Sequence, residues 1–166
     1  TSMKNSTTTS GSVAIGYGAM GEGTTTGDHN IAIGYQAGED LTSAVESVII
    51  GHQAGANLLT GDSNTIIGYE AGKGTTAGTN MTIVGRRAGN AVITSAAAGT
   101  VLMGYESGLV LTSGAGNQGF GYRTLKSLTT GDNNTMVGHE AGDAMVTGAG
   151  NTGVGKSALG AYTGSF

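Results

Sequence analysis

The chain has 166 residues, a length that suits one ordinary domain, and 33 of them are Gly, whereas Pro, Cys and Trp are absent. The lack of Cys excludes disulfides, thiolate metal sites and thiol redox chemistry within this sequence. Seven Lys and Arg against eleven Asp and Glu give a formal net charge of −4. No basic field would attract nucleic acid, so we expect no nucleic-acid partner.

The N-terminal segment TSMKNSTTTSGS is polar and lacks the apolar core of a signal peptide. No stretch approaches the ~18 consecutive apolar residues of a membrane-spanning helix. We therefore expect no membrane insertion. A secreted or virion location would need a signal or machinery outside this chain.

From residue 11 onward the sequence repeats one unit, an apolar triplet such as VAI or TII that ends at a Gly, often preceded by a turn such as GDSN or GAGN. Successive anchor glycines are 17 residues apart, except for one spacing of 18 and one of 19. The nine anchors are Gly16, Gly34, Gly51, Gly68, Gly85, Gly104, Gly121, Gly138 and Gly155. We expect a lead-in segment over 1–10 and a single repeat domain of nine coils over 11–166.

A unit of 17 residues is too short for a helical repeat, and its β-branched triplet is typical of a strand. The unit has room for two strands of about four to six residues and two turns, with Gly, Asp and Asn at left-handed turn positions. The pattern predicts an all-β fold, a parallel β-solenoid of nine coils. Coils stacked at roughly 4.8 Å would form a rod on the order of 40 Å long.

Two positions of the triplet are apolar in most units. We expect the residue before each anchor to fill the coil interior: Ile15, Ile33, Ile50, Ile67, Val84, Met103, Phe120, Val137 and Val154. The residue before that lies on the opposite strand face, where the large side chains are Ile49, Ile66, Ile83, Leu102 and Met136. A slender coil has one interior, so this second face predicts a cover of identical chains in a parallel homotrimer, intertwined or side by side. A dimer and an unpartnered two-sided solenoid are the alternatives.

Two residues after the anchors, the charges alternate in sign along five coils: Glu70, Arg87, Glu106, Arg123 and Glu140. Side chains in one column lie about one strand spacing apart, and each exposed pair of opposite charges contributes roughly 0.2–1 kcal/mol. This pattern predicts a charge ladder between coils that specifies register more than it adds stability.

The residue directly after each anchor is mostly aromatic, and this column holds five of the six Tyr. It reads Tyr17, Tyr35, His52, Tyr69, Arg86, Tyr105, Tyr122 and His139, followed by Lys156. One interpretation is a stacked ladder that supports the fold, since most repeated residues in a repeat protein are structural. The other is a ligand stripe for glycans, because an exposed Tyr offers a flat apolar face with a polar tip.

The segment GNTGVGKS, 150–157, matches the phosphate-binding loop of nucleotide hydrolases. Every residue of this match has a place in the repeat, and only ALGAYTGSF follows, whereas a phosphate loop needs a following helix. The segment GAGNQG, 114–119, fits a dinucleotide pattern and fails for the same reason. We expect no nucleotide cofactor.

Calcium-binding β-rolls use Asp-rich turns, but Asp28, Asp62 and Asp132 place only one carboxylate in each turn. A role in the turn, with Asp bonding its own backbone, explains them better. The three His are scattered over distant coils, and no Ser/His/Asp grouping can be argued. We expect no metal site, no catalytic site and no enzymatic activity.

The repeats NTIIGYEAG, NIAIGYQAG and NTMVGHEAG, with the SVAIG core at 12–16, resemble two related groups. One is the β-roll head of trimeric autotransporter adhesins; the other is the Gly-rich repeats of bacteriophage tail fibres and tail spikes. The resemblance covers residues 11 to about 159. The repeat is longer than that of the autotransporter head, which favours the phage group, and no coiled-coil stalk, membrane anchor or chaperone accompanies it.

The resemblance implies a trimeric, extracellular attachment fibre on a virion tail or a bacterial surface, with a bacterial or host glycan or receptor as partner. We expect this chain to be part of a longer fibre. A glycan-binding module is the second hypothesis. Ice binding ranks lower, because Thr does not occupy one column through all coils.

Overall fold

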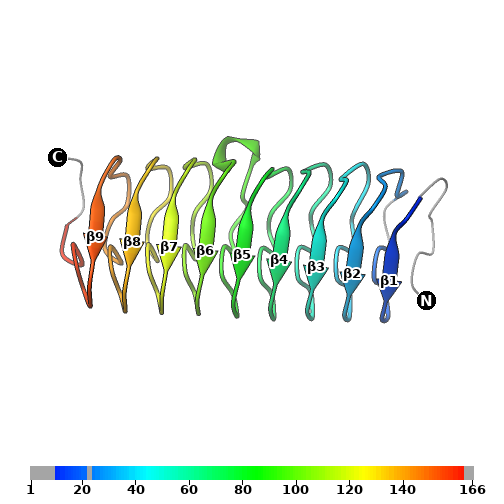
Figure 1. Ribbon diagram of the computed structural model, residues 1–166, viewed down its shortest axis with the longest axis horizontal. Helices are drawn as coiled ribbons and strands as arrows, with labels where there is room; N and C mark the ends of the chain where they lie inside the picture. Colours follow the sequence, from blue (N-terminus) through cyan, green and yellow to red (C-terminus); the bar gives the residue numbers. More distant parts are fainter. Residues whose placement is uncertain (1–9, 22–23, 163–166) are drawn as a thin grey trace.

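The computed structural model describes residues 10–21 and 24–162, so most of the predicted lead-in segment lies outside the described residues. The chain is one elongated stack of coils with a strand in each coil (Figure 1). The strands are β1 (Val13–Ile15), β2 (Ile31–Ile33), β3 (Val48–Ile50), β4 (Thr65–Ile67), β5 (Thr82–Val84), β6 (Val101–Met103), β7 (Gln118–Phe120), β8 (Thr135–Val137) and β9 (Thr152–Val154).

All nine strands pair in parallel with their sequence neighbours, in the order β1 to β9, and form one sheet. The register follows the repeat, so that equivalent residues of successive triplets face each other, for example Ile49 against Ile66 and Ile66 against Ile83. The prediction of an all-β, parallel β-solenoid is confirmed.

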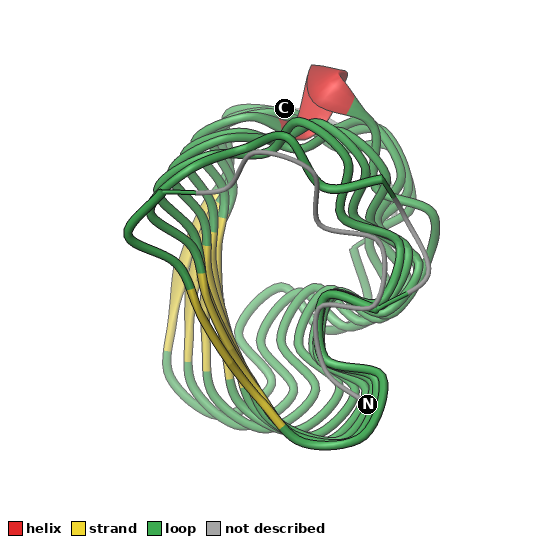
Figure 2. Ribbon diagram, turned by 90° about the vertical axis from the view of Figure 1, so that its right-hand side faces the viewer, coloured by secondary structure: helices red, strands yellow, loops and turns green. Residues whose placement is uncertain are grey.

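Each coil has one strand of three residues, where the sequence predicted two longer ones. The rest of the coil is a loop that closes around the interior, and the strands lie together on one side of it (Figure 2). These loops still stack through backbone hydrogen bonds along the axis, such as Thr42 N to Leu59 O at 3.0 Å and Leu59 N to Thr76 O at 2.9 Å. They do not extend into strands because left-handed residues recur in every coil.

The anchor positions require glycine for two reasons: their backbone conformation is one that residues with side chains rarely adopt, and the next coil leaves no space for a Cβ atom. Gly85 has a φ of 134°, and a Cβ atom placed on it would lie 2.4 Å from the carbonyl oxygen of Gly104. The second position after the anchor is also left-handed although its residues carry side chains, as in Glu70 (φ 51°) and Arg87 (φ 57°). The chain therefore turns sharply just after every strand.

The middle residue of each strand, not the last one, faces the interior. Ile49, Ile66, Ile83, Leu102 and Met136 have no exposed surface. They are the residues assigned above to a trimer face, so that assignment is wrong. The predicted interior residues lie instead on the outer face, half-buried or exposed: Ile15, Ile33, Ile50, Ile67, Val84, Met103, Phe120, Val137 and Val154. The alternation of a strand places its first and third residues on one face and its middle residue on the other.

Two further rows of each coil complete the interior. The small residue three positions after the anchor is buried from Ala19 to Ala141, and in two coils its hydroxyl pairs with its neighbour, Ser107 Oγ to Thr124 Oγ1 at 2.7 Å. Opposite the strands lies a row of buried larger side chains: Leu41, Leu58, Ile93, Leu111, Leu128 and Met145. Every interior side chain thus packs against the coils above and below it.

The one coil with a spacing of 19 residues carries the 3₁₀ helix η1 (Ser95–Ala97). It projects from the loop side of the solenoid (Figure 2). Ala97 is buried, whereas Ser95 and Ala96 are exposed. The two extra residues are therefore absorbed in a local protrusion, and the strand register on the opposite side is unaffected.

Candidate functional surface

The first and third residues of β1 to β9 form a continuous surface on the outer face of the sheet, here called the outer strip, in which one row is apolar throughout and the other mixes Val and Ile with Thr and Gln. Its third-residue row consists only of Ile, Val, Met and Phe. Its first-residue row is Val13, Ile31, Val48, Thr65, Thr82, Val101, Gln118, Thr135 and Thr152. In the inner coils the exposure of the third-residue row reaches 39% at Met103, and it rises to 56% at Ile15 and 72% at Val154 in the two end strands, which have a neighbour on one side only. No pocket is found in the described part of the chain, so this strip is the most prominent candidate for binding.

Next to the outer strip runs a ladder of stacked rings, here called the aromatic ladder. Ring centroids are 5.4 Å apart for Tyr17–Tyr35, 5.0 Å for Tyr35–His52 and 5.1 Å for His52–Tyr69, with interplanar angles of 15° to 18°. Arg86 continues the stack, its guanidinium carbon lying 5.4 Å from the Tyr69 centroid and 5.6 Å from that of Tyr105. The column predicted from the sequence is therefore one contiguous stack.

The stack continues from Tyr105 to Tyr122 and His139, at 5.2 Å and 4.8 Å. Within it each ring covers the face of the next one and presents its edge to solvent. The glycan interpretation depended on an open apolar face on which a sugar could stack. This geometry favours the structural interpretation, because the faces between neighbouring rings are occupied.

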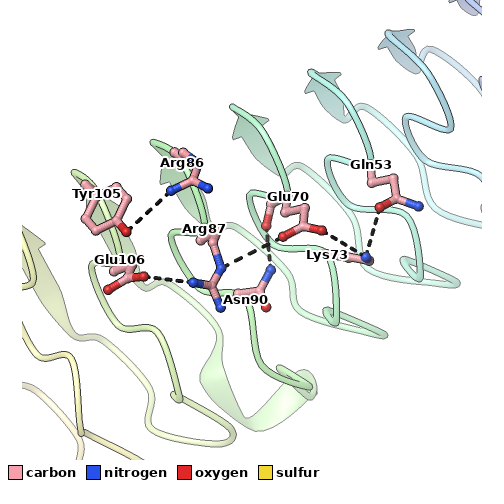
Figure 3. A network of polar contacts seen from close by, with 8 residues as sticks. All are labelled: Gln53, Glu70, Lys73, Arg86, Arg87, Asn90, Tyr105 and Glu106. Atoms are coloured by element: carbon pink, nitrogen blue, oxygen red, sulfur yellow. Dashed lines mark hydrogen bonds and ion pairs between the residues drawn. The ribbon is translucent and has the colours of Figure 1, made fainter.

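The predicted charge ladder lies beside the aromatic ladder (Figure 3). Arg87 bridges two coils, with Nε 3.9 Å from Glu70 and Nη1 2.9 Å from Glu106. Arg123 Nε lies 3.1 Å from the other oxygen of Glu106. The predicted ladder is thus present from Glu70 to Arg123. Among the described residues its fifth member, Glu140, pairs with His139 at 3.4 Å instead.

Side chains outside the predicted ladder extend it. Lys73 Nζ reaches Glu70 at 3.1 Å and Gln53 at 2.9 Å, and Gln53 donates to Gln36 at 2.9 Å. Asn90 donates to the backbone oxygen of Glu70 at 2.9 Å. The Lys73–Glu70 contact lies within one coil, whereas the contacts of Lys73 with Gln53 and of Asn90 with Glu70 join successive coils (Figure 3). The network therefore holds neighbouring coils together at the point where each chain turn leaves the strand.

Glu106 is the enclosed centre of this network, with a side chain only 5% exposed. Burial alone would raise its pKa, but hydrogen bonds from Tyr105 and Arg123 and the charges of Arg123 and Arg87 outweigh it, so the pKa lies below the ordinary value. The prediction of exposed, weak pairs does not hold at this position. The carboxylate stays ionised because two guanidinium groups face it.

The turn aspartates bond to the preceding coil, not to their own turn as expected. Asp62 Oδ1 accepts from the backbone N–H of Val45 at 3.0 Å, and Asp132 Oδ1 from that of Ala115 at 2.8 Å. Asp28 does the same for Ser10. Each of these carboxylates therefore accepts a hydrogen bond from one backbone N–H of the preceding coil, a role that needs only one carboxylate in the turn.

The buried Asn that precedes several strands is a row that sequence reasoning did not interpret. Asn64 contacts the equivalent turn of the next coil, where its Nδ2 donates to Gly78 O at 2.7 Å and its Oδ1 accepts from Met81 N at 3.0 Å. Asn117 and Asn134 form the same two contacts, whereas Asn151 Nδ2 donates to Ala149 O of its own turn and to Asn134 Oδ1. The sequence did indicate this row, because an Asn ends each of the GDSN and GAGN turns.

The nucleotide-loop motif has no phosphate-loop geometry. β9 (Thr152–Val154) lies inside it, and the residues that follow up to Tyr162 form turns. The other motif, 114–119, likewise leads into β7. Across the described ranges no three His, Asp or Glu are placed to hold a metal ion. His29, His52 and His139 belong to the turns beside β2, β3 and β8.

The chain matches no protein-family model, and no curated protein or solved structure is significantly similar to it. Within the described residues, no helix is long and apolar enough to cross a membrane.

Proposed function

We propose that this chain is a rigid shaft segment of an extracellular attachment fibre, such as a phage tail fibre or a cell-surface trimeric adhesin. In this proposal identical chains run in parallel and associate as a homotrimer. The repeat sequences that resemble such fibres support it, together with a solenoid in which every coil presents the same surface. The receptor is a bacterial or host surface group bound by the fibre.

The observation that carries the proposal is the outer strip. Nine strands at about 4.8 Å, each about 10 Å long, give a strip of about 400 Å². This is within the range of the largest patches on monomeric proteins, which are often functional. A standard interface uses about 800 Å² from each partner. Because every coil adds the same two positions, a longer fibre would enlarge the interface in proportion.

The partner we infer is another copy of the chain. The described ion pairs of the charge ladder lie beside the strip and are satisfied within the chain, and the strip itself carries no charged residue. A partner with the same spacing between strands and the same repeat can match it coil for coil, and a second copy of this chain has both. Parallel chains would place each coil next to its equivalent.

Two neighbouring residues of β4 test the proposal. Ile67 belongs to the outer strip, whereas Ile66 is fully buried in the interior. Ile67→Asp should leave the single chain folded but prevent association, because an interface would bury an unpaired charge. Ile66→Asp should unfold the chain, at a cost of several kcal/mol. Circular dichroism reports folding, and light scattering reports mass.

Val92→Asp is the matched control, since Val92 is 56% exposed and lies away from the outer strip. It should change neither folding nor mass. An Ile67→Asp chain that is folded and has the same mass as the unaltered assembly would show that the strip is not the interface.

A further inference from the structure

The aromatic ladder holds two pairs of tyrosines that are direct neighbours. These are Tyr17 with Tyr35, at 5.4 Å between ring centroids, and Tyr105 with Tyr122, at 5.2 Å. The rings of each pair are close to parallel, at 15° and 12°. Each pair joins two successive coils through positions that the parallel register keeps together.

The remaining tyrosine of the ladder has different neighbours. Tyr69 stacks on His52 at 5.1 Å on one side and on the Arg86 guanidinium on the other. Its exposure of 44% lies between those of the paired tyrosines, which range from the half-buried Tyr105 to Tyr17 at 66%. The chain thus contains both the paired arrangement and an internal control for it.

We propose that Tyr17–Tyr35 and Tyr105–Tyr122 are sites of dityrosine formation, which would link neighbouring coils covalently under oxidation. The oxidant is a haem peroxidase acting with hydrogen peroxide. Each phenol loses one electron and one proton to give a tyrosyl radical. The two radicals form a carbon–carbon bond between ring carbons ortho to the hydroxyls.

The two ortho hydrogens then return to the phenolic oxygens, so each link removes two hydrogen atoms in total. One hydrogen peroxide accepts them and yields two water molecules. The new bond is about 1.5 Å long, so the rings must approach by a few ångströms, which exposed side chains at the surface can do by rotation about χ1 and χ2. A partner ring held beside the radical has a high effective concentration, which favours coupling within the chain over coupling between chains.

A link of this kind would do in this Cys-free chain what a disulfide does elsewhere. It would close the loop of one coil and constrain the unfolded chain. The inference does not depend on self-association, because both rings of each pair come from one chain.

The test is oxidation of the whole chain with peroxidase and hydrogen peroxide, followed by digestion after Glu and mass spectrometry. Cleavage at Glu22 and Glu39 separates Tyr17 from Tyr35, and cleavage at Glu106 separates Tyr105 from Tyr122. We expect peptide 1–22 linked to 23–39 and peptide 71–106 linked to 107–140, each pair lacking two hydrogen atoms. Denaturing electrophoresis should show single chains.

Three Phe variants identify the partners. Tyr35→Phe should abolish the first linked peptide and keep the second, and Tyr122→Phe should do the reverse. Tyr69→Phe should keep both, at an unchanged blue fluorescence of dityrosine. N-acetyl-tyrosine amide in a parallel tube shows that the oxidant is active.

Three results would overturn the proposal. One is the absence of dityrosine under conditions that couple the free tyrosine derivative. The second is linkage through the Tyr69 peptide, 47–70, at a similar yield. The third is a denaturing gel on which dityrosine is found only in covalently linked dimers or larger species, and not in single chains.

Discussion

Glu106 shows how one side chain holds three coils in register. Each of its two carboxylate oxygens forms an ion pair with one guanidinium, that of Arg87 in the preceding coil or that of Arg123 in the following one. The side chain extends from a residue in the left-handed region, with a φ of 52°. The carboxylate lies between the two neighbouring coils, since its partners belong to the coil before and the coil after it.

This environment makes stability depend on pH in one direction. The pKa of Glu106 is lower in the folded chain than its ordinary value of 4.5, so the stabilisation is present above that value and is lost as the pH falls through the folded pKa. Glu106→Gln should cost roughly 1.5–3 kcal/mol at neutral pH, because it weakens hydrogen bonds between charged groups. The difference from the unaltered chain should shrink as the pH is lowered below 4.5, measured by thermal unfolding.

Glu140→Gln is the matched control in the same column. Its carboxylate is 32% exposed and pairs with His139, so its loss should cost clearly less at neutral pH. Equal costs for the two variants, or a Glu106→Gln difference that persists in acid, would contradict the role assigned to Glu106.

The coil is the element of this fold, and much of it could be predicted from the sequence. Each strand is the triplet that ends at an anchor Gly. The aromatic column is contiguous, and the charge column is contiguous from Glu70 to Arg123 but not to Glu140. These features follow from period and register alone, since equivalent residues of successive coils are stacked.

The inward face of the strand could not be predicted in the same way. All three positions of triplets such as VII are apolar, so the alternation that normally separates core from surface is missing. A signal was available in Gly119 and Gly153, because the interior row includes small residues while the outer row keeps large ones such as Phe120. The left-handed backbone at Glu70 or Arg123 gave no such signal, because those residue types rarely adopt it.

A single coil should be removable without loss of the fold. Deleting residues 51–67 joins Ile50 to Gly68 and restores the pattern of strand, Gly and Tyr at the junction. Each coil contacts only its neighbours, so a shorter solenoid should remain folded with a modestly lower melting temperature. Circular dichroism and thermal unfolding measure this.

Deleting only residues 52–59 is the control, because it leaves one coil about half its length, too short to close around the interior, and so interrupts the stack between the coils on either side. That variant should not fold cooperatively. If the whole-coil deletion behaved no better than the half-coil deletion, the coils would not be independent units.

At the scale of the whole molecule, the coils stack in one row (Figure 1), and the outer strip runs along the length of this stack. The interior is complete within one chain, so a partner is not needed to fill the core. Association in the proposed fibre would therefore be side by side, through the outer face of the strands. This differs from the expectation of a trimer face built on Ile49, Ile66 and Ile83, which are buried within the chain.

The mass of the chain in solution, measured by light scattering at low micromolar concentration, tests the central claim most directly. Self-association of the outer strip in a homotrimer predicts three times the chain mass of 16.2 kDa. A folded species of 16.2 kDa would contradict the proposed assembly.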